Sequence, residues 1–399
     1  MIYESSQQAA DRLGVTIHTI RKWAKEGRIP GAMQRGHSWM IPADFVPTEE
    51  QDAPMEHVEP QSTISERAVR TAMPLMNSAY PVGKCRAFID TIPDEDDRTI
   101  ALGEYYYFCG QAELAAKTME PYQDSADPVL RYSANLVGFF SNFTRGHTRQ
   151  AMYAFERVQA DLQRDLRTDS APQLRAIGVF AATASSVLLH LPMSGNIDLQ
   201  RYICYLPEGL KLWACYMLAH REYLEKNYSG SLAIAELALS ISPQMYPVAA
   251  IYMHLVIVMN LMSLRRVNEA KQHIEEAWAL AQQDGLIEPF GEHHGLLQGM
   301  IELFFQKEYP EAFERIIAIT YSFSAGWREI HRLVAKQEVA DNLTTTEFTI
   351  AMLYNRGWTA KEIATYMLLS PRTITNTIQV IYQKLGISSK RELGQFMLA

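Results

Sequence analysis

The chain has 399 residues, of which 48% are hydrophobic, and it carries a formal net charge of −8. This length allows two or three domains with sizeable cores. The N-terminus has neither a basic region nor an apolar run, which argues against an export signal. The most apolar stretches, 176–193 and 248–262, contain polar residues and are better explained as buried helices than as membrane spans. We therefore expect a cytoplasmic protein that does not enter a membrane.

The cysteines show no close Cys-x-x-Cys pair and no matching histidine spacing. This pattern favours reduced, buried thiols over disulfides or a metal site, and it is typical of a cytosolic protein. The four residues are Cys85, Cys109, Cys204 and Cys215.

Charge is distributed unevenly along the chain. Residues 1–47 hold six basic and four acidic residues, and residues 341–399 hold the same numbers, so each end carries +2 and residues 48–340 carry −12. Mildly basic ends allow contact with nucleic acid, and the acidic middle disfavours it.

Residues 1–47 read as a compact helix-turn-helix unit with a hairpin. Ser5-Ser6-Gln7-Gln8 forms the pattern of a capping box at the start of a first helix. Thr16 is a suitable N-cap for a second helix directly after a Gly-Val-Thr turn. Arg35-Gly36-His37 then fits the tip of a hairpin between two short strands. A cationic hairpin beside a helix-turn-helix predicts a wing that reaches the sugar-phosphate backbone.

This segment resembles the MerR/excisionase-type winged helix. The resemblance rests on the Ala-Ala-Asp-x-Leu-Gly-Val stretch at 9–15, the Thr-Ile-x-x-Trp stretch at 19–23, the Glu-Gly-Arg-Ile-Pro link at 26–30 and the wing at 34–42. It implies DNA contacts from Thr16, His18, Thr19, Arg21 and Lys22 on the second helix and from Arg35 and His37 on the wing. The long coiled coil of full MerR proteins is missing. Residues 48–61 are instead acidic and contain proline, which predicts a flexible linker.

Residues 62–340 read as successive helices, which we expect to form a sensor or oligomerisation domain. Small residues recur in similar settings, and successive ones are separated by 36, 80, 39 and 42 residues. We interpret the separation of 80 residues as two periods with one signal missing. The marker positions are Ala115, Ala151, Ser231, Ala270 and Ala312. The pattern loosely resembles tetratricopeptide (TPR) repeats, which implies an α-solenoid with a concave binding surface. An irregular helical bundle is the alternative.

The middle region offers no pattern typical of an active site. Gly83-Lys84 lacks the upstream glycine of a phosphate-binding loop. Glu292-His293-His294, with Glu288 nearby, suggests metal binding, but adjacent histidines on a helix point about 100° apart. We interpret the segment as a polar helix surface whose hydrogen bonds are satisfied. We expect no metal, no cofactor, no catalytic residue and no enzymatic activity.

Residues 341–399 read as four short helices, three of them opened by capping boxes at Thr344…Glu347, Thr359…Glu362 and Ser389…Glu392. The third helix lies between the N-cap Ser370 and Gly386. Its apolar stripe consists of Ile374, Ile378, Ile381 and Leu385. The opposite face is polar, with Arg372, Thr375, Asn376, Gln379 and Gln383. Such a face suits base edges in a DNA major groove.

This region is similar to the LuxR-type C-terminal helix-turn-helix. The resemblance rests on Leu343-Thr344…Glu347, 357–364, Leu369-Ser370…Thr373-Ile374, 384–387 and 391–393. It implies base reading by Thr375, Asn376 and Gln379, and phosphate contacts by Lys361, Arg372, Thr373, Lys384 and Lys390. It also implies that the fourth helix pairs two subunits, with Leu393, Phe396 and Met397 as candidates.

Three positions depart from that family, because Thr346, Thr375 and Thr377 stand where Arg, Lys and His are usual. Phosphate affinity comes mostly from cations, so we expect weak DNA binding by a single copy of this domain. Binding should therefore depend on dimerisation or on the N-terminal domain.

These observations predict a mainly α chain that acts as a bacterial transcription regulator, with a DNA-binding domain at each end. Its partners would be double-stranded DNA, a second copy of the chain in a homodimer, and a ligand, peptide or protein that binds the helical middle. The alternative is a helical-repeat interaction scaffold whose terminal modules bind proteins, and the small charge of each end keeps it open.

Overall fold

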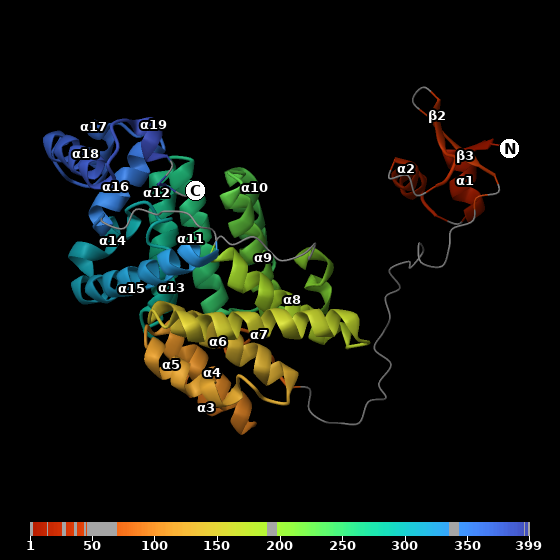
Figure 1. Cartoon of the computed structure of the whole chain (residues 1–399), viewed down its shortest axis with the longest axis horizontal. Helices are drawn as coiled ribbons and strands as arrows, with labels where there is room; N and C mark the ends of the chain where they lie inside the picture. The colour runs from red at the N-terminus through yellow and green to blue at the C-terminus, as the bar shows by residue number, and fades with distance from the viewer. Residues whose placement is uncertain are drawn as a thin grey trace. The chain divides into compact units, whose positions relative to one another are not determined.

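A computed structural model of the chain describes residues 3–13, 15–25, 29–35, 38–43, 45, 70–189, 198–334, 343–394 and 396–397. The chain divides into two compact units, Met1–Ala68 and Val69–Ala399. The described residues form helices α1–α19 and one small three-stranded sheet, which confirms the expected mainly α fold (Figure 1). The predicted linker at 48–61 lies outside the described residues.

The N-terminal unit contains β1 (Tyr3–Ser5), α1 (Ser6–Leu13), α2 (Ile17–Lys25), β2 (Met33–Arg35) and β3 (Ser38–Pro42). Its antiparallel strands lie in the order β1-β3-β2. The pairing of β2 with β3 confirms the expected hairpin. Strand β1 was not expected, because three residues are too few to show an alternating pattern.

Local hydrogen bonds explain where the N-terminal helices begin. The Gln8 side-chain oxygen accepts from the Ser5 backbone N–H at 2.9 Å, and the Ser5 hydroxyl accepts from the Gln8 N–H at 3.3 Å. The predicted capping box is therefore present. Thr16 likewise accepts from the Thr19 N–H at 3.2 Å at the start of α2. Both helices and β3 pack on a small core of Ala9, Ala10, Ile20, Trp23, Ala24, Ile29 and Ile41.

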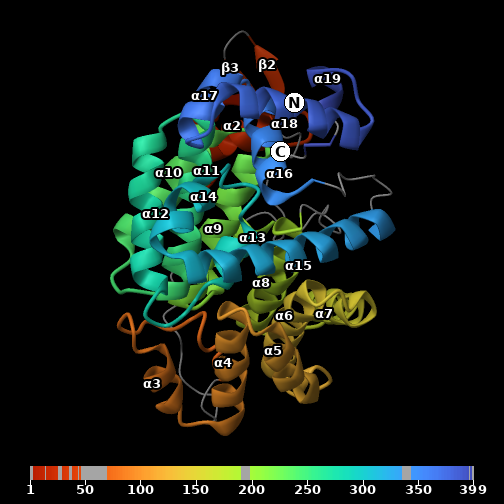
Figure 2. The same cartoon turned by 90° about the vertical axis from the view of Figure 1, so that its left-hand side faces the viewer.

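The second unit begins with an array of helices. Its helices are α3 (Cys85–Asp90), α4 (Glu95–Phe108), α5 (Ala112–Met119), α6 (Pro128–Thr144), α7 (Thr148–Arg167), α8 (Pro172–Val187), α9 (Glu208–Leu224), α10 (Tyr228–Ile241), α11 (Pro247–Ser263), α12 (Val267–Ala281), α13 (Glu288–Glu292), α14 (Met300–Glu308) and α15 (Pro310–Val334). Short 3-10 turns lie at Glu120–Tyr122, Leu199–Arg201 and Ile203–Tyr205. Figure 2 shows the array from the side.

Four helical hairpins of the array close in the same way. In α4–α5, α6–α7, α9–α10 and α11–α12, one loop residue adopts a left-handed conformation, with φ between 59° and 75°. The next residue donates its N–H to a carbonyl five residues earlier, which satisfies the end of the first helix. The left-handed residues are Gly110, Gly146, Lys226 and Arg265.

The small marker residues lie on the second helix of each hairpin. Ala115, Ala151, Ser231 and Ala270 are fully buried, and Ala312 is partly buried on α15. The 80-residue gap, interpreted above as two periods with one marker missing, does not show a second complete hairpin among its described residues. Between α7 and α9, the described residues form one helix, α8, and two 3-10 turns. Membership of the TPR family stays a prediction.

The apolar stretch 248–262 lies within α11, and the first twelve residues of the stretch 176–193 lie within α8, where all of them are buried, whereas residues 190–193 lie outside the described residues. Of the helices in the described ranges, none combines the length and the apolarity that a membrane crossing requires. All four cysteines are free thiols, and Cys85 and Cys109 are buried as expected. Cys204 is exposed, against expectation, because it lies in a short 3-10 turn at the surface of the array.

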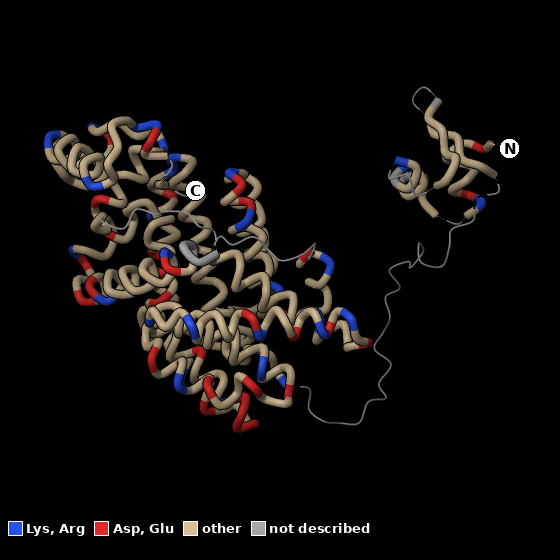
Figure 3. The backbone as a smooth tube through the Cα atoms, in the orientation of Figure 1, with Lys and Arg blue, Asp and Glu red and all other residues tan. Residues whose placement is uncertain are grey.

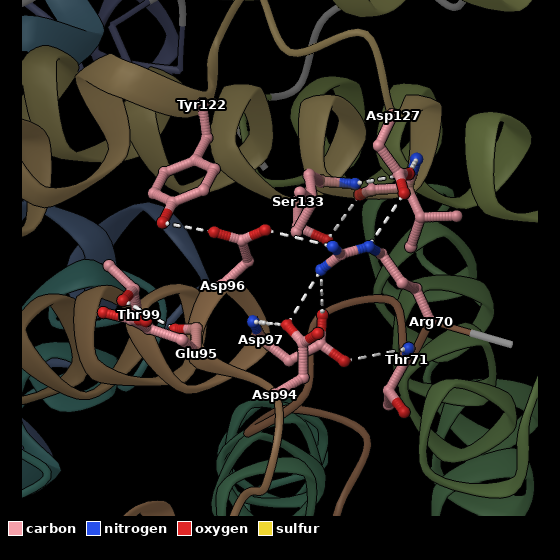
Figure 4. A network of polar contacts seen from close by, with 12 residues as sticks. Arg70, Thr71, Asp94, Glu95, Asp96, Asp97, Thr99, Tyr122, Asp127 and Ser133 are labelled. Atoms are coloured by element: carbon pink, nitrogen blue, oxygen red, sulfur yellow. Dashed lines mark hydrogen bonds and ion pairs between the residues drawn. The ribbon is translucent and has the colours of Figure 1, made fainter. Parts of the chain in front are cut away.

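An arginine fixes the start of the array. Figure 4 shows the Arg70 guanidinium surrounded by carboxylates, with Asp94 and Asp127 both at 2.9 Å, Asp96 at 3.0 Å and Asp97 at 3.3 Å. Asp94 and Asp127 are the N-caps of α4 and α6. A hydrogen bond from the Asp97 backbone N–H, followed by the charge of Arg70, lowers the pKa of Asp94. The Arg70 guanidinium thus joins the first described residue of the second unit to the N-termini of two helices.

The last helices are α16 (Thr345–Asn355), α17 (Ala360–Tyr366), α18 (Pro371–Leu385) and α19 (Lys390–Leu393). Figures 1 and 2 both show them at one end of the array, with α3–α5 at the other. The buried residues of these helices, such as Ile350, Ile363 and Ile374, belong to the same continuous core as the array. The C-terminal helices are therefore packed onto the array and form one compact unit with it.

Candidate nucleic-acid interface

The four C-terminal helices begin as the sequence predicts. Thr344 with Glu347 and Thr359 with Glu362 form complete capping boxes. The Ser370 hydroxyl accepts from the Thr373 N–H at 3.0 Å, and Gly386 ends α18 with φ of 66°. Ser389 caps α19 by accepting from the Glu392 N–H. These caps satisfy backbone groups that would otherwise be exposed at the ends of short helices.

The two faces of α18 differ as predicted. Ile374 and Ile381 are buried, and Ile378 and Leu385 are partly buried against the core. All five residues assigned to the polar face are exposed, and so is Thr373, which was predicted to contact a phosphate. The six exposed residues are Arg372, Thr373, Thr375, Asn376, Gln379 and Gln383. The array therefore does not cover this face, which is open to solvent.

Hydrogen bonds within α18 already engage some of these polar groups. The Thr375 hydroxyl donates to the Pro371 carbonyl at 3.0 Å, and the Thr373 hydroxyl lies 2.8 Å from that of Ser370. Within the described ranges, Arg372, Asn376 and Gln379 have no partner for their side chains. The free guanidinium and two amides are the strongest candidates for contacts with DNA, because amides can make bidentate contacts with base edges.

The predicted phosphate contacts fall into two groups. Lys361 and Arg372 are exposed, with no ion pair in the described part of the chain. Lys384 instead forms an ion pair with Glu347 at 2.7 Å, and Lys390 lies 4.5 Å above the ring of Tyr354. Partial burial alone would raise the pKa of Glu347, but the hydrogen bonds from Lys384 and Thr344 outweigh it and lower this pKa. The local positive charge is therefore smaller than the sequence suggests.

Figure 3 places this face in the charge pattern of the second unit. Acidic residues gather around α3–α5, and basic residues are spread over α17–α19 at the opposite end. The charge separation inferred from the sequence is thus also a separation in space. An acidic far end opposes non-specific contact of the array with DNA.

The candidates for subunit pairing lie mostly inside the chain. Leu393 and Met397 are 1% and 3% exposed, and Phe396 is partly buried against the core. In this conformation they offer little free apolar surface, and their role in dimerisation stays a prediction. Leu368 and Leu369, in the turn before α18, are 68% and 39% exposed. Helical periodicity does not apply to these two residues, because they lie in a turn in which Leu368 adopts a positive φ of 57°.

In the N-terminal unit, three of the predicted contact residues can be located in full. Thr16 and Arg21 are exposed, and Thr19 is partly buried with its hydroxyl 2.8 Å from that of Thr16. His18 and Lys22 lie on α2 and Arg35 lies at the end of β2, but their side chains lie outside the described residues, as does the whole of His37.

Two arginines hold the C-terminal helices on the array. Arg356, at the end of α16, donates to the Ser263 hydroxyl and, at 2.5 Å, to the Tyr223 hydroxyl. It also lies over the rings of Tyr223 and Tyr228. In the opposite direction, Arg265 of the α11–α12 loop donates to the Gly357 carbonyl at 2.9 Å.

Arg265 makes two further contacts with the C-terminal helices. It pairs with Glu362 at 3.2 Å and lies over the ring of Trp358. The hydrogen bonds of Thr359, with a smaller contribution from Arg265, lower the pKa of Glu362. We call the contact between the array and helices α16–α19 the seam. The sequence did not reveal the seam, because each of its contacts joins residues about a hundred positions apart and leaves no periodic pattern.

The seam also contains polar atoms without partners. Glu302 Oε2, Thr349 Oγ1 and Tyr366 OH are buried and have no hydrogen-bond partner in the part of the chain that the structure describes. A Cβ at Gly299 would lie 2.7 Å from Thr349 and 3.1 Å from Tyr366, which places these side chains against the array. Unsatisfied buried groups cost free energy, so the seam is less stable than a purely apolar contact would be.

A cavity of about 160 Å³ lies between the array and α16. Its apolar wall includes Phe323, Trp327, Phe348 and Phe396, and its polar lining includes Glu292, His294, Thr320, Ser324 and Arg328. Burial raises the pKa of Glu292 to about 7, and its carboxylate accepts from Tyr107 and, at 2.7 Å, from Tyr252. A smaller apolar cavity of about 40 Å³ on the other side of Glu292 is lined by Trp213, Tyr216 and Tyr252.

The Glu292-His293-His294 segment is not the polar surface that we expected. His293 and His294, directly after α13, are only 1% and 2% exposed, and α13 itself packs against α11 and α15. Their rings do point to different partners. His293 Nε2 lies 2.6 Å from the Tyr216 hydroxyl, and His294 Nε2 lies 2.9 Å from Glu302.

Comparisons with known proteins agree with this geometry at both ends of the chain. Residues 341–397 match the family model described as bacterial regulatory proteins, luxR family, and residues 5–44 match the model described as a helix-turn-helix domain. No curated protein and no solved structure matches the chain. The chain therefore carries a LuxR-family helix-turn-helix at its C-terminus and a second helix-turn-helix near its N-terminus, which together support a DNA-binding regulator.

Proposed function

We propose that the chain is a transcription regulator that binds a specific site on double-stranded DNA through α18 and through the N-terminal winged helix. The exposed amide face of α18, held on a rigid helical unit, is the observation that carries this proposal. Asn376 and Gln379 would read base edges, and Arg372 and Lys361 would contact phosphates. The modest charge of each end makes joint binding by two domains the stronger arrangement.

The first test uses the full-length protein and a duplex that it selects from a random library. Gln379→Ala should weaken binding to the selected duplex far more than binding to random DNA. Arg372→Ala should weaken both and lower the slope of log affinity against log salt by about 1. Gln306→Ala, at an exposed position on α14, is the matched control. If no duplex is preferred over random DNA, the proposal fails and the protein-binding scaffold becomes the better explanation.

The array would control the C-terminal domain through a small molecule in the 160 Å³ cavity. Three observations support this part of the proposal. The cavity lies directly at the seam, it combines an aromatic wall with ionisable groups, and the seam contains unsatisfied polar atoms. Such a lining suits an amphipathic molecule with an apolar body and a polar head. A ligand that fits only one arrangement of the seam would shift the position of α16.

A cavity-filling substitution tests this idea. Fragments that raise the unfolding temperature of the wild-type chain should lose that effect in Ser324→Trp, which fills the cavity. They should keep it in Ser240→Trp, at an exposed position on α10. Fragments that stabilise both variants equally would contradict binding at the seam.

A further inference from the structure

Two histidines and a glutamate lie close together on the α11–α12 hairpin, away from the polar face of α18. His254 projects from α11, and His273 and Glu276 project from one face of α12, since residues three apart share a helix face. His254 Nδ1 lies 3.0 Å from His273 Nδ1. Glu276 Oε2 lies 3.2 Å from the first nitrogen and 3.3 Å from the second.

Protons on the two imidazoles cannot satisfy this triangle of atoms while Glu276 is ionised. If only one Nδ1 carries a proton, the other nitrogen and the carboxylate oxygen face each other as two acceptors. If both nitrogens carry protons, the two N–H groups face each other across 3.0 Å. With an ionised Glu276, every neutral tautomer of the two imidazoles therefore leaves at least one of the three close contacts unfavourable. A cation shared by all three atoms removes the conflict.

The burial of the three side chains suits a bound ion. His254 and His273 side chains are 13% and 25% exposed, and Glu276 is 57% exposed. The two imidazoles are thus held largely away from solvent. The exposed side of Glu276 leaves room for water to complete the coordination.

We propose that His254 Nδ1, His273 Nδ1 and Glu276 Oε2 form a site for a divalent transition-metal ion, with Zn²⁺ as the best match. Two imidazoles and one carboxylate are ligands that Zn²⁺ accepts readily, whereas Mg²⁺ and Ca²⁺ prefer oxygen. A circle through the three atoms has a radius of about 1.8 Å, so an ion about 2.1 Å from each would lie ~1 Å above their plane. That placement is compatible with a tetrahedral ion whose fourth ligand is water.

The ion would join the two helices of one hairpin. The loop of the same hairpin carries Arg265, which contacts the C-terminal helices through Gly357 and Glu362. Metal binding would therefore stiffen the element on which the C-terminal domain sits. The metal site itself does not depend on the proposed DNA-binding function.

The test uses metal-free, full-length protein in a Cys204→Ser background, because an exposed thiol could bind zinc on its own. Competition with a chromophoric chelator should show one zinc ion per chain, and zinc should raise the unfolding temperature while Mg²⁺ should not. Glu276→Gln and His273→Ala should each weaken zinc binding at least ~10–100-fold. His147→Ala, at an exposed histidine before α7, should change nothing.

Cobalt substitution provides an independent readout. Bound Co²⁺ should give the intense visible absorption of a tetrahedral site in the wild-type chain and in His147→Ala, but not in Glu276→Gln. Glu276 is exposed, so this variant should fold normally, and its circular dichroism would verify that. The proposal is overturned if the wild-type chain does not bind zinc, or if the double variant His273→Ala/Glu276→Gln binds it as tightly as the wild-type chain does.

Discussion

The two helix-turn-helix units differ in what stabilises them. The N-terminal unit has a core of its own, and among its described residues Ser6 is the only buried polar side chain. The C-terminal helices share one continuous core with an array that buries several carboxylates. The same DNA-binding motif is thus self-contained at one end and part of a larger body at the other. A change in the array can reach the C-terminal helices through direct packing, whereas the N-terminal core contains no residue of the array.

The largest expected effect that distinguishes the two units concerns pH. Burial raises the pKa of Glu104 to about 8, and hydrogen bonds from Met76 and Leu75 only partly offset this. Above its ordinary value of 4.5 the carboxyl ionises in the unfolded chain but stays protonated in the folded chain. The free energy of unfolding should therefore fall as pH rises from 5 to 8, by up to about 4 kcal/mol.

Hydrogen exchange across this pH range would measure the effect in each unit separately, after correction for the intrinsic exchange rates. Glu104→Gln should reduce the decline in α4–α19, with the raised pKa of Glu292 responsible for part of what is left, and it should leave the N-terminal unit unchanged. A decline of equal size in wild-type and Glu104→Gln proteins would show that Glu104 is not its source.

The next largest effect concerns the seam. Arg356→Ala removes two hydrogen bonds and two cation–π contacts and leaves the Tyr223 hydroxyl without this donor. We expect a loss of about 3 kcal/mol in the unfolding free energy of the second unit. Chemical denaturation of the full chain should show that loss, with the N-terminal transition unmoved. Arg391→Ala, at an exposed arginine on α19, is the control. Equal losses in both units would contradict the separation of the two cores.

A smaller effect concerns recognition at the C-terminal end. Asn376→Ala should reduce discrimination between the selected duplex and random DNA by about 1–3 kcal/mol, the value typical of one bidentate base contact. Fluorescence anisotropy at fixed salt would measure both affinities. Thr365→Ala, on the exposed side of α17, should change neither affinity. A uniform loss on both duplexes would assign Asn376 to the backbone instead.

The smallest expected effect concerns two equivalent helix N-caps, one in each unit. Thr359→Ala and Thr16→Ala each remove the hydroxyl that caps a short helix, at a cost of about 1 kcal/mol. The first substitution should destabilise only the second unit, and the second only the N-terminal unit. Hydrogen exchange of α17 and α2 would separate the two. A change in α2 caused by Thr359→Ala would reveal coupling between the units.

Local signals made the terminal units predictable. Capping boxes, the Ser370-Pro371 start and Gly386 mark helix ends within a few residues, and the two faces of α18 follow from a short period. The small residues Ala115, Ala151 and Ala270 likewise marked the hairpins, because close helix approach requires them locally. The seam, the burial of His293 and the cluster at His254 could not be predicted, since they depend on contacts between segments far apart in the sequence.

The left-handed residue of the α11–α12 loop, Arg265, is not the residue type that its backbone conformation favours. Glycine adopts this conformation without strain, and two of the four similar loops use it, at Gly110 and Gly146. The α11–α12 loop instead has Arg265, with φ of 59°, at a conformational cost of about 1 kcal/mol. Its side chain holds the C-terminal helices. Arg265→Gly would therefore remove the backbone strain of the turn, and it would also remove the Arg265 contacts with Gly357 and Glu362 while those of Arg356 remain.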